Sequence, residues 1–229
     1  DTWMQELLKG DLGPQLAGWI FIMISVIMTV LRFYAGPIVN KFSSIGLLVI
    51  SAALAIAGLL CLWKAAGMVL IAAAILYAFG KTFLWSTTLG LVSEQFPKGG
   101  ALTLNGVSAV GVLGMGILGA PLMGFYLDKG TDADLKEVPA IYEKVSAPAK
   151  PTMFGDSPTL DSAAVSTLEG EEKETLVRIQ NSNKKDAFLR QSVLPAFLLL
   201  CYLILFFYFK SKGGYKPVEL ADGTSAGAH

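Results

Sequence analysis

Five long stretches of this 229-residue sequence carry almost no charged side chains, and they limit the possible fold more than any other feature. A bilayer core about 30 Å thick is crossed by a helix of roughly 20 apolar residues. The stretches have about that length and cover residues 15–38, 45–63, 66–93, 101–127 and 191–210. We therefore expect an all-α integral membrane protein with five transmembrane helices.

The composition agrees with a membrane protein and argues against several other classes. The chain is 53% hydrophobic and 16% charged, with a mean hydropathy of +0.56. Its formal net charge is zero and it has no basic stripe, so we expect no nucleic-acid partner. His229 is the only histidine, and Cys61 and Cys201 lie inside apolar stretches. We therefore expect no catalytic residues, no metal site and no cofactor, and we predict that the protein is not an enzyme.

Three polar segments surround the expected spans. Residues 1–14 are an outer or interfacial lead, and residues 211–229 are a polar tail. The long loop at 128–190 precedes the last span; its prolines predict an irregular first half. In residues 161–190 the spacing of acidic and basic side chains predicts a surface helix that runs into the last span. The loop has too little apolar surface to predict a core of its own.

The connections between the spans predict how neighbouring helices meet. Ser43 and Ser44 precede the second span and can cap its start. The reversal between the second and third spans takes only a few residues around 65–67, so these two helices must be antiparallel neighbours. The fourth span is rich in glycine, which we interpret as a means of close helix packing rather than chemistry. Its glycines are Gly106, Gly111, Gly114, Gly116, Gly119 and Gly124.

Lys81 is the feature of these spans that most needs an explanation. It lies about twelve residues from either end of the third span, roughly 18 Å at 1.5 Å per residue, which is too far for its side chain to reach an interface. A lysine at that depth costs about 2.5–3.5 kcal/mol on insertion scales and usually has a function. The alternative is that Lys81 pairs with a carboxylate on another helix and holds the bundle together. Because Glu94 and Asp128 lie at span ends, that carboxylate would have to come from outside this chain.

The distribution of basic residues in the short connections predicts the orientation in the membrane. Lys9 and Lys64 flank one face, against six basic residues on the other, which the positive-inside rule places in the cytoplasm. The six are Arg32, Lys41, Lys98, Lys210, Lys212 and Lys216. We therefore expect a cytoplasmic C-terminus and an extracytoplasmic loop at 128–190, in the plasma membrane.

Three short motifs, in order on consecutive spans, resemble those of the major facilitator superfamily. The first is RFYAGPIVNKFSSIGLL at residues 32–48, where Gly36 and Lys41 match but Asn40 stands in the acidic position and cannot form an ion pair. The second is Glu94 with Pro97, which resembles the joint between the fourth and fifth helices of a half. The third is a glycine-proline helix that ends with Gly124 and Asp128.

The resemblance implies a larger assembly and a mechanism. The five spans would be helices two to six of a six-helix half, the C-terminal half of a twelve-helix bundle, with a long polar loop before the last helix. The first helix would precede Asp1, and the N-terminal half would be a partner. The implied function is secondary active transport by alternating access. Eight residues would have gating or structural roles: Arg32, Gly36, Asn40, Lys41, Glu94, Pro97, Gly124 and Asp128.

In this family the fourth helix of each half borders the central cavity, and that helix is the span with Lys81. Residues four, eight and eleven positions apart share a face of a helix. Tyr77, Lys81, Trp85 and Thr88 therefore form one stripe, our predicted substrate site. A cation, two aromatic rings and hydroxyl groups suit a small polar or anionic solute. The solute, the direction of transport and a coupling ion such as H⁺ or Na⁺ stay open.

Three other functions are weaker explanations of the same residues. A channel usually has a filter sequence or a ring of charges, and neither is visible. A membrane-embedded enzyme needs converging acids, histidines or cysteines, and the spans supply essentially one lysine. A membrane-embedded sensor or receptor would use loop 128–190 to bind a ligand or partner, and this is the alternative that we retain.

Overall fold

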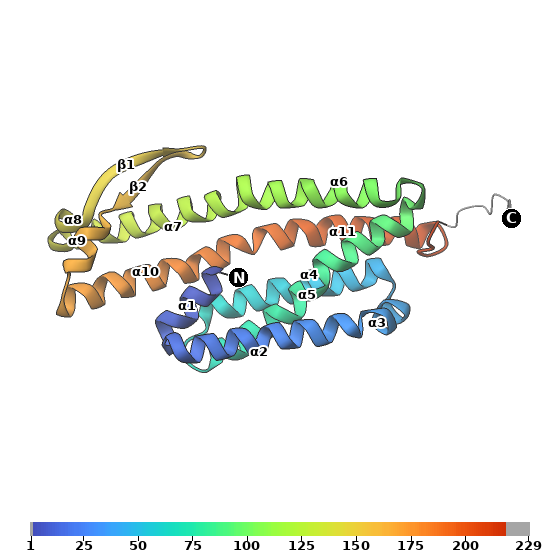
Figure 1. Ribbon diagram of the computed structural model, residues 1–229, viewed down its shortest axis with the longest axis horizontal. Coiled ribbons are helices and arrows are strands. Elements are labelled where there is room, and N and C mark those ends of the chain that lie inside the picture. The colour runs from blue at the N-terminus through green and yellow to red at the C-terminus, as the bar shows by residue number, and fades with distance from the viewer. Residues whose placement is uncertain (1, 219–229) are drawn as a thin grey trace, which may run out of the picture.

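The structure is a computed structural model that describes residues 2–218, and it is a long bundle of helices with one β-hairpin (Figure 1). Five helical segments are long and apolar enough to cross a membrane, which confirms the expected fold class. Their elements are α2 (Pro14–Phe33), α4 (Ser44–Lys64), α5 (Val69–Gln95), the run of α6 (Gly100–Leu113), η2 (Gly114–Gly119) and α7 (Ala120–Leu135), and α11 (Val193–Ser211).

The remaining elements lie at the two ends of the bundle. They are α1 (Thr2–Leu12), α3 (Ala35–Phe42), η1 (Pro97–Gly99), α8 (Pro139–Val145), β1 (Ser146–Thr152), β2 (Gly155–Leu160), α9 (Ser162–Thr167) and α10 (Gly170–Gln191). We call residues 128–191 the cap, and the end of the bundle that carries it the cap end. The opposite end, with α3 and the C-terminal segment, is the tail end (Figure 1). The predicted tail at 211–229 lies mostly outside the described residues.

Helices α4 and α5 form the tightest pair of the bundle. The Ser43 hydroxyl accepts a hydrogen bond from the Gly46 N–H at 3.2 Å, which confirms the predicted N-terminal capping of helix α4 by a serine. A short turn then brings α5 back antiparallel along α4, as the short connection predicts. A Cβ on Gly58 would lie 2.5 Å from the Tyr77 Cα, and a Cβ on Gly80 would overlap the backbone of Ala55. The two backbones therefore meet at both glycines, which lets the helices approach more closely than larger residues permit.

Three prolines explain where the long helices are interrupted. Proline has no N–H to donate to the carbonyl four residues earlier, so the helix is disturbed just before it. The break at Tyr34 between α2 and α3 precedes Pro37, and Ser192 between α10 and α11 precedes Pro195. The π-helical turn η2 ends two residues before Pro121. The predicted span at 15–38 is thus divided, because α2 ends at Phe33 and a separate helix follows.

The cap corrects our expectation of an irregular loop without a core. Helix α7 continues to Leu135, and α8 leads into an antiparallel hairpin of β1 and β2. Leu135, Ile141, Val145, Leu168 and Leu176 form a buried cluster between these elements. The sequence prediction was wrong because these side chains come from α7, α8, α10 and the segment before α10, which are separated in the chain. Helix α10, by contrast, confirms the predicted surface helix that runs into the last span.

The glycines of the fourth span also differ from our interpretation. Of the six, only Gly111 shows close packing, since a Cβ there would lie 2.6 Å from the Trp85 ring of α5. A Cβ on Gly106, Gly114, Gly116 or Gly124 would meet no atom within 4 Å. Gly114, Gly116 and Gly119 instead lie in the π-helical turn. Among the described glycines, Gly58 and Gly80 are the two at which a Cβ would meet the backbone of a neighbouring helix.

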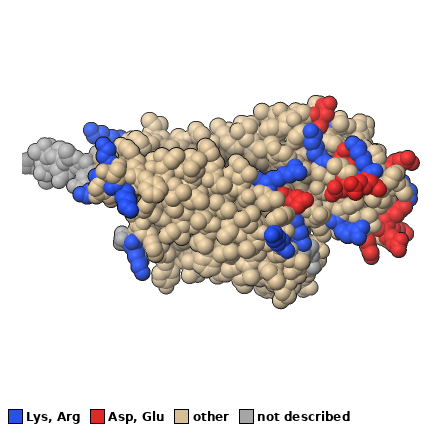
Figure 2. Space-filling model, turned by 180° about the vertical axis from the view of Figure 1, so that it is seen from behind, with Lys and Arg blue, Asp and Glu red and all other residues tan. Residues whose placement is uncertain are grey.

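The surface of the molecule separates into charged ends and an apolar middle. In Figure 2, the tail end shows only basic side chains, whereas the cap end shows acidic and basic side chains together. The surface between them is almost free of charge, as a bilayer-crossing protein requires. The protein is therefore integral to a membrane.

The contact of α4 and α5 predicts a position-specific effect of a single methyl group. Gly80→Ala forces a Cβ into the backbone of Ala55, so we expect a loss of about 1–3 kcal/mol of stability, as for other overpacked sites. Gly90→Ala, on the same helix but with no neighbour within 4 Å, should be neutral or slightly stabilising because Ala favours helix. Thermal unfolding of the purified variants in detergent measures both. Equal melting temperatures for the two variants would contradict the close contact.

Candidate functional site

Lys81 lies near the middle of α5 and is half-buried. Its Nζ atom is 5.4 Å from the centroid of the Tyr77 ring, one helical turn towards the cap end. A cation over an aromatic face gains about 0.5–2 kcal/mol, depending on how far the pair is desolvated. Tyr77 itself packs against the main core cluster, so its ring has a fixed position beside the ammonium group.

A second cation, Arg32, lies near Lys81 on the neighbouring helix. Arg32 is in the last turn of α2, which packs against α5, and it is exposed. The two positive charges are close enough to repel each other. Sequence analysis had placed Arg32 among the gating or structural residues rather than beside Lys81. Two adjacent spans thus present basic groups to one region.

The other two residues of the predicted stripe contact different helices. The Trp85 ring packs at Gly111 of α6 and is 45% exposed. Thr88 donates from its hydroxyl to the Leu84 carbonyl at 2.6 Å and lies 3.1 Å from the hydroxyl oxygen of Tyr202 on α11. The structure therefore brings Lys81, Tyr77 and Arg32 together, while Trp85 and Thr88 connect α5 to α6 and α11. Their role in binding stays a prediction.

Glu94, one of the predicted gating or structural residues, is the centre of a hydrogen-bond network at the tail end. Its carboxylate accepts from the Ser44 hydroxyl at 2.8 Å and from the Tyr215 hydroxyl. Its backbone carbonyl accepts from the Val218 N–H at 2.8 Å, and the Gln95 side chain donates to the Lys216 carbonyl at 3.0 Å. The start of α4, the end of α5 and the C-terminal segment are therefore joined at Glu94.

The environment of Tyr215 makes it a stable donor in this network. Burial, together with the hydrogen bond to Glu94, raises the pKa of Tyr215 from 10.0 to about 12. The ring also packs edge-on against Phe209 of α11, with the centroids 5.2 Å apart. Tyr215 therefore stays protonated throughout the physiological range and keeps the C-terminal segment bound to α5.

The remaining predicted motif residues at the tail end have looser surroundings. Gly36 in α3 has room for a Cβ, and Lys41 is exposed with its Nζ atom 5.8 Å from the Phe42 ring centroid. Pro97 begins η1 and so ends α5. The side chain of Asn40 lies outside the described part of the structure.

At the cap end, the predicted pair of Gly124 and Asp128 flanks the point where α7 leaves the apolar middle. A Cβ on Gly124 would meet no neighbour within 4 Å. Asp128 accepts a hydrogen bond at 2.8 Å from the hydroxyl of Ser157 in β2, a side chain that is only 2% exposed. Asp128 thus attaches the hairpin to α7.

Comparison with known families identifies the class of protein. A family model described as Major Facilitator Superfamily matches residues 2–131, which span α1 to most of α7. The chain belongs to this superfamily. Members of the major facilitator superfamily are membrane transporters and generally not enzymes, so membrane transport is the function that membership supports. Searches of curated proteins and of solved structures found no match.

Sequence reasoning missed two tyrosines that the superfamily motifs do not include. Tyr202 meets Thr88 across α5 and α11, and Tyr215 meets Glu94 from a segment 121 residues away in the chain. Neither tyrosine lies in a motif, so only the folded arrangement reveals them. The proximity of Arg32 and Lys81 had a signal, because both are basic residues in otherwise uncharged stretches.

The network at Glu94 predicts the ionisation of Tyr215. A raised pKa means that the neutral, bound form persists to high pH and is lost as the pH rises through about 12. Subtracting the ultraviolet titration of Tyr215→Phe from that of the wild type isolates the ionisation of Tyr215. We expect this difference curve to have its midpoint near pH 12. In a Glu94→Ala background the midpoint should fall, because the hydrogen bond to Glu94 that helps to raise the pKa of Tyr215 is removed. A midpoint at 10.0 in the wild-type background would contradict the network.

Proposed function

We propose that the chain forms part of a secondary active transporter that moves a small polar or anionic solute by alternating access, with Lys81 in its binding site. The observation that carries the proposal is the proximity of Lys81 and Arg32 on adjacent spans. Two like charges repel more strongly at the low dielectric of a membrane protein than in water. An anionic solute near both cations relieves that repulsion, and so gains affinity from each.

The neighbours of Lys81 support a site rather than a purely structural charge. The Tyr77 ring stabilises the ammonium group without neutralising it, because a cation–π contact leaves the net charge in place. The carboxylates that the sequence offered as partners, Glu94 and Asp128, accept hydrogen bonds from Ser44 and Ser157 at opposite ends of the bundle. We propose that the positive charge near the middle of α5 attracts the solute.

The remaining parts of the proposal concern assembly and orientation. In alternating access, two halves rock around a site at their interface, and we propose that a second six-helix half completes the cavity. We further propose that the tail end faces the cytoplasm and the cap lies outside. The purely basic surface at the tail end in Figure 2 supports this orientation, because basic residues accumulate on the cytoplasmic side.

The binding role of Lys81 is tested with the full-length protein. A thermal-shift screen against sugars, organic anions and nucleosides first selects a ligand, which we expect to be an organic anion. Lys81→Met keeps an unbranched side chain that is one atom shorter, and it removes the charged ammonium group. We expect it to abolish the thermal shift and to lower uptake into proteoliposomes about 10- to 100-fold, the effect of losing one charge-assisted hydrogen bond of about 1.5–3 kcal/mol.

Lys64→Met is the matched control. Lys64 ends α4 at the cap end, with its Nζ atom 5.1 Å from the Trp63 ring, so its loss should leave the thermal shift and uptake unchanged. Lys81→Met should insert into the membrane at least as well as the wild type, because removing a lysine from mid-span lowers the cost of insertion. Normal uptake by Lys81→Met, or an equal loss in Lys64→Met, would refute the binding role.

A further inference from the structure

The β-hairpin of the cap runs along α7 back towards the apolar middle of the protein. The Ser157 hydroxyl donates to Asp128 at 2.8 Å, and the Phe154 ring lies 6.1 Å from the Phe125 ring. A step of three residues back along the chain, from Ser157 to Phe154, therefore matches a step of three residues back from Asp128 to Phe125. Because Phe125 lies nearer the apolar middle than Asp128 on α7, the tip of the hairpin points towards the apolar middle.

Side chains from several helices mark the membrane boundary at this level. Asp128 is the first charged residue after Lys98, so the intervening part of the span is uncharged. The Trp63 indole at the end of α4 donates to Asp186 at 3.0 Å, and the Arg190 guanidinium lies 5.3 Å from the Tyr126 ring. Aromatic rings paired with charged groups are typical of the lipid headgroup region. The hairpin tip thus reaches the bilayer side of the first charge on α7.

The tip itself has the chemistry of a membrane contact. Met153 is 73% exposed, and Phe154 beside it is only half-buried against Phe125. Two cations flank this apolar tip. The Nζ atom of Lys129 lies 4.6 Å from the Phe125 ring, and Lys150 in β1 is exposed. Apolar side chains beside lysines match the boundary between acyl chains and phosphates.

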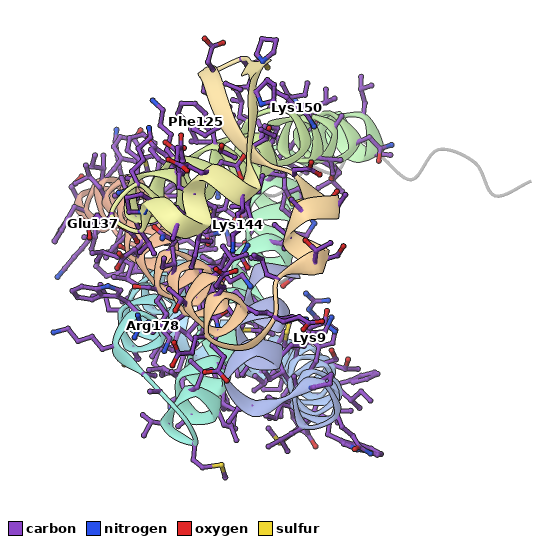
Figure 3. All side chains as sticks on the ribbon, turned by 90° about the vertical axis from the view of Figure 1, so that its left-hand side faces the viewer. Lys9, Phe125, Glu137, Lys144, Lys150 and Arg178 are labelled. Carbon is purple, nitrogen blue, oxygen red and sulfur yellow. The ribbon has the colours of Figure 1, made fainter. Side chains whose placement is uncertain are left out.

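The strands of the hairpin are poorly suited to a protein partner that adds a third strand. The sheet has only two strands, so each has a free edge. Pro148 and Pro151 in β1 and Pro158 in β2 remove backbone donors, which is how natural sheets block pairing at their edges. Figure 3 shows the hairpin at the periphery of the molecule, on the opposite side from α2. A lipid surface fits this position better than a protein strand.

We propose that Met153 and Phe154 insert into the headgroup region of the leaflet at the cap end, with Lys129 and Lys150 against lipid phosphates. The hairpin then holds the cap against the membrane surface. Because the cap core joins the hairpin to α7 and α10, this contact fixes both helices relative to the bilayer. The assignment concerns the cap alone and does not depend on the identity of the solute.

The test uses spin labels on the full-length protein in vesicles of phosphatidylcholine and phosphatidylglycerol, with native cysteines replaced by alanine. The label is attached to Met153→Cys and, as the matched control, to Ser146→Cys at the exposed base of the same hairpin. We expect the Met153 label to relax more with oxygen, which concentrates in lipid, than with a water-soluble nickel chelate. The Ser146 label should respond in the reverse order.

Two results for the Met153 label would overturn the proposed insertion of the hairpin tip. If the Met153 label prefers the nickel chelate as strongly as the Ser146 label, the tip is in water. If neither reagent reaches the Met153 label, another protein segment covers the tip. Because Met153 is exposed, its replacement should not disturb folding. The lysines are tested with Lys150→Gln, which should reduce the lipid preference of the Met153 label when phosphatidylglycerol is present. An unchanged preference would refute the phosphate contact.

Discussion

The close contact of α4 and α5 is the constraint on which the rest of the structure depends. At Gly58 and Gly80 the backbones meet without intervening side chains, so the rotation of each helix about its axis is fixed. Lys81 follows Gly80 and so points about 100° away from α4 around the helix. With that rotation Lys81 lies near Arg32 of α2, the Trp85 ring packs at Gly111 of α6, and Thr88 lies beside Tyr202 of α11. A different contact between α4 and α5 would bring a different set of residues to the candidate site.

The two ends of the bundle are held by different means. At the tail end, hydrogen bonds to Glu94 join α4, α5 and the C-terminal segment. At the cap end, α7 and α10 extend beyond the apolar middle and share a small core with the hairpin. Asn183 of α10 adds a polar connection there, since its amide donates to Asp134 at 2.8 Å. The site around Lys81 thus lies between one end joined by hydrogen bonds and another joined by apolar packing together with hydrogen bonds.

The sequence predicted those parts of the fold that depend on local patterns. Uncharged runs located the five spans because a bilayer demands about 20 apolar residues for each, and Ser43 marked the start of α4 because a hydroxyl caps a helix. The cap core, the Gly58 and Gly80 contacts and the bond of Tyr215 to Glu94 were missed. Each joins residues that are distant in the chain and depends on how helices are rotated, which a pattern along one segment does not contain.

The candidate site was predicted only in part for the same reason. Spacing placed Tyr77, Lys81, Trp85 and Thr88 on one face of a helix, but spacing does not say which neighbour each side chain meets. Arg32 joined the site because α2 packs against α5. Thr88 meets Tyr202 because α11, which packs along α4, also reaches α5. The superfamily motifs marked the ends of the helices, whereas the charge near the middle of α5 came from the cost of burying a lysine.

The central claim, that Lys81 lies in a cavity open alternately to the two sides of the membrane, is tested most directly by its access to water. Lys81→Cys, in a full-length protein whose native cysteines are replaced by alanine, would be exposed to a membrane-impermeant thiol reagent from one side or the other in sealed vesicles. Alternating access predicts modification from both sides, each slowed by the anion that the protein transports. Modification from one side only, or from neither, would contradict it.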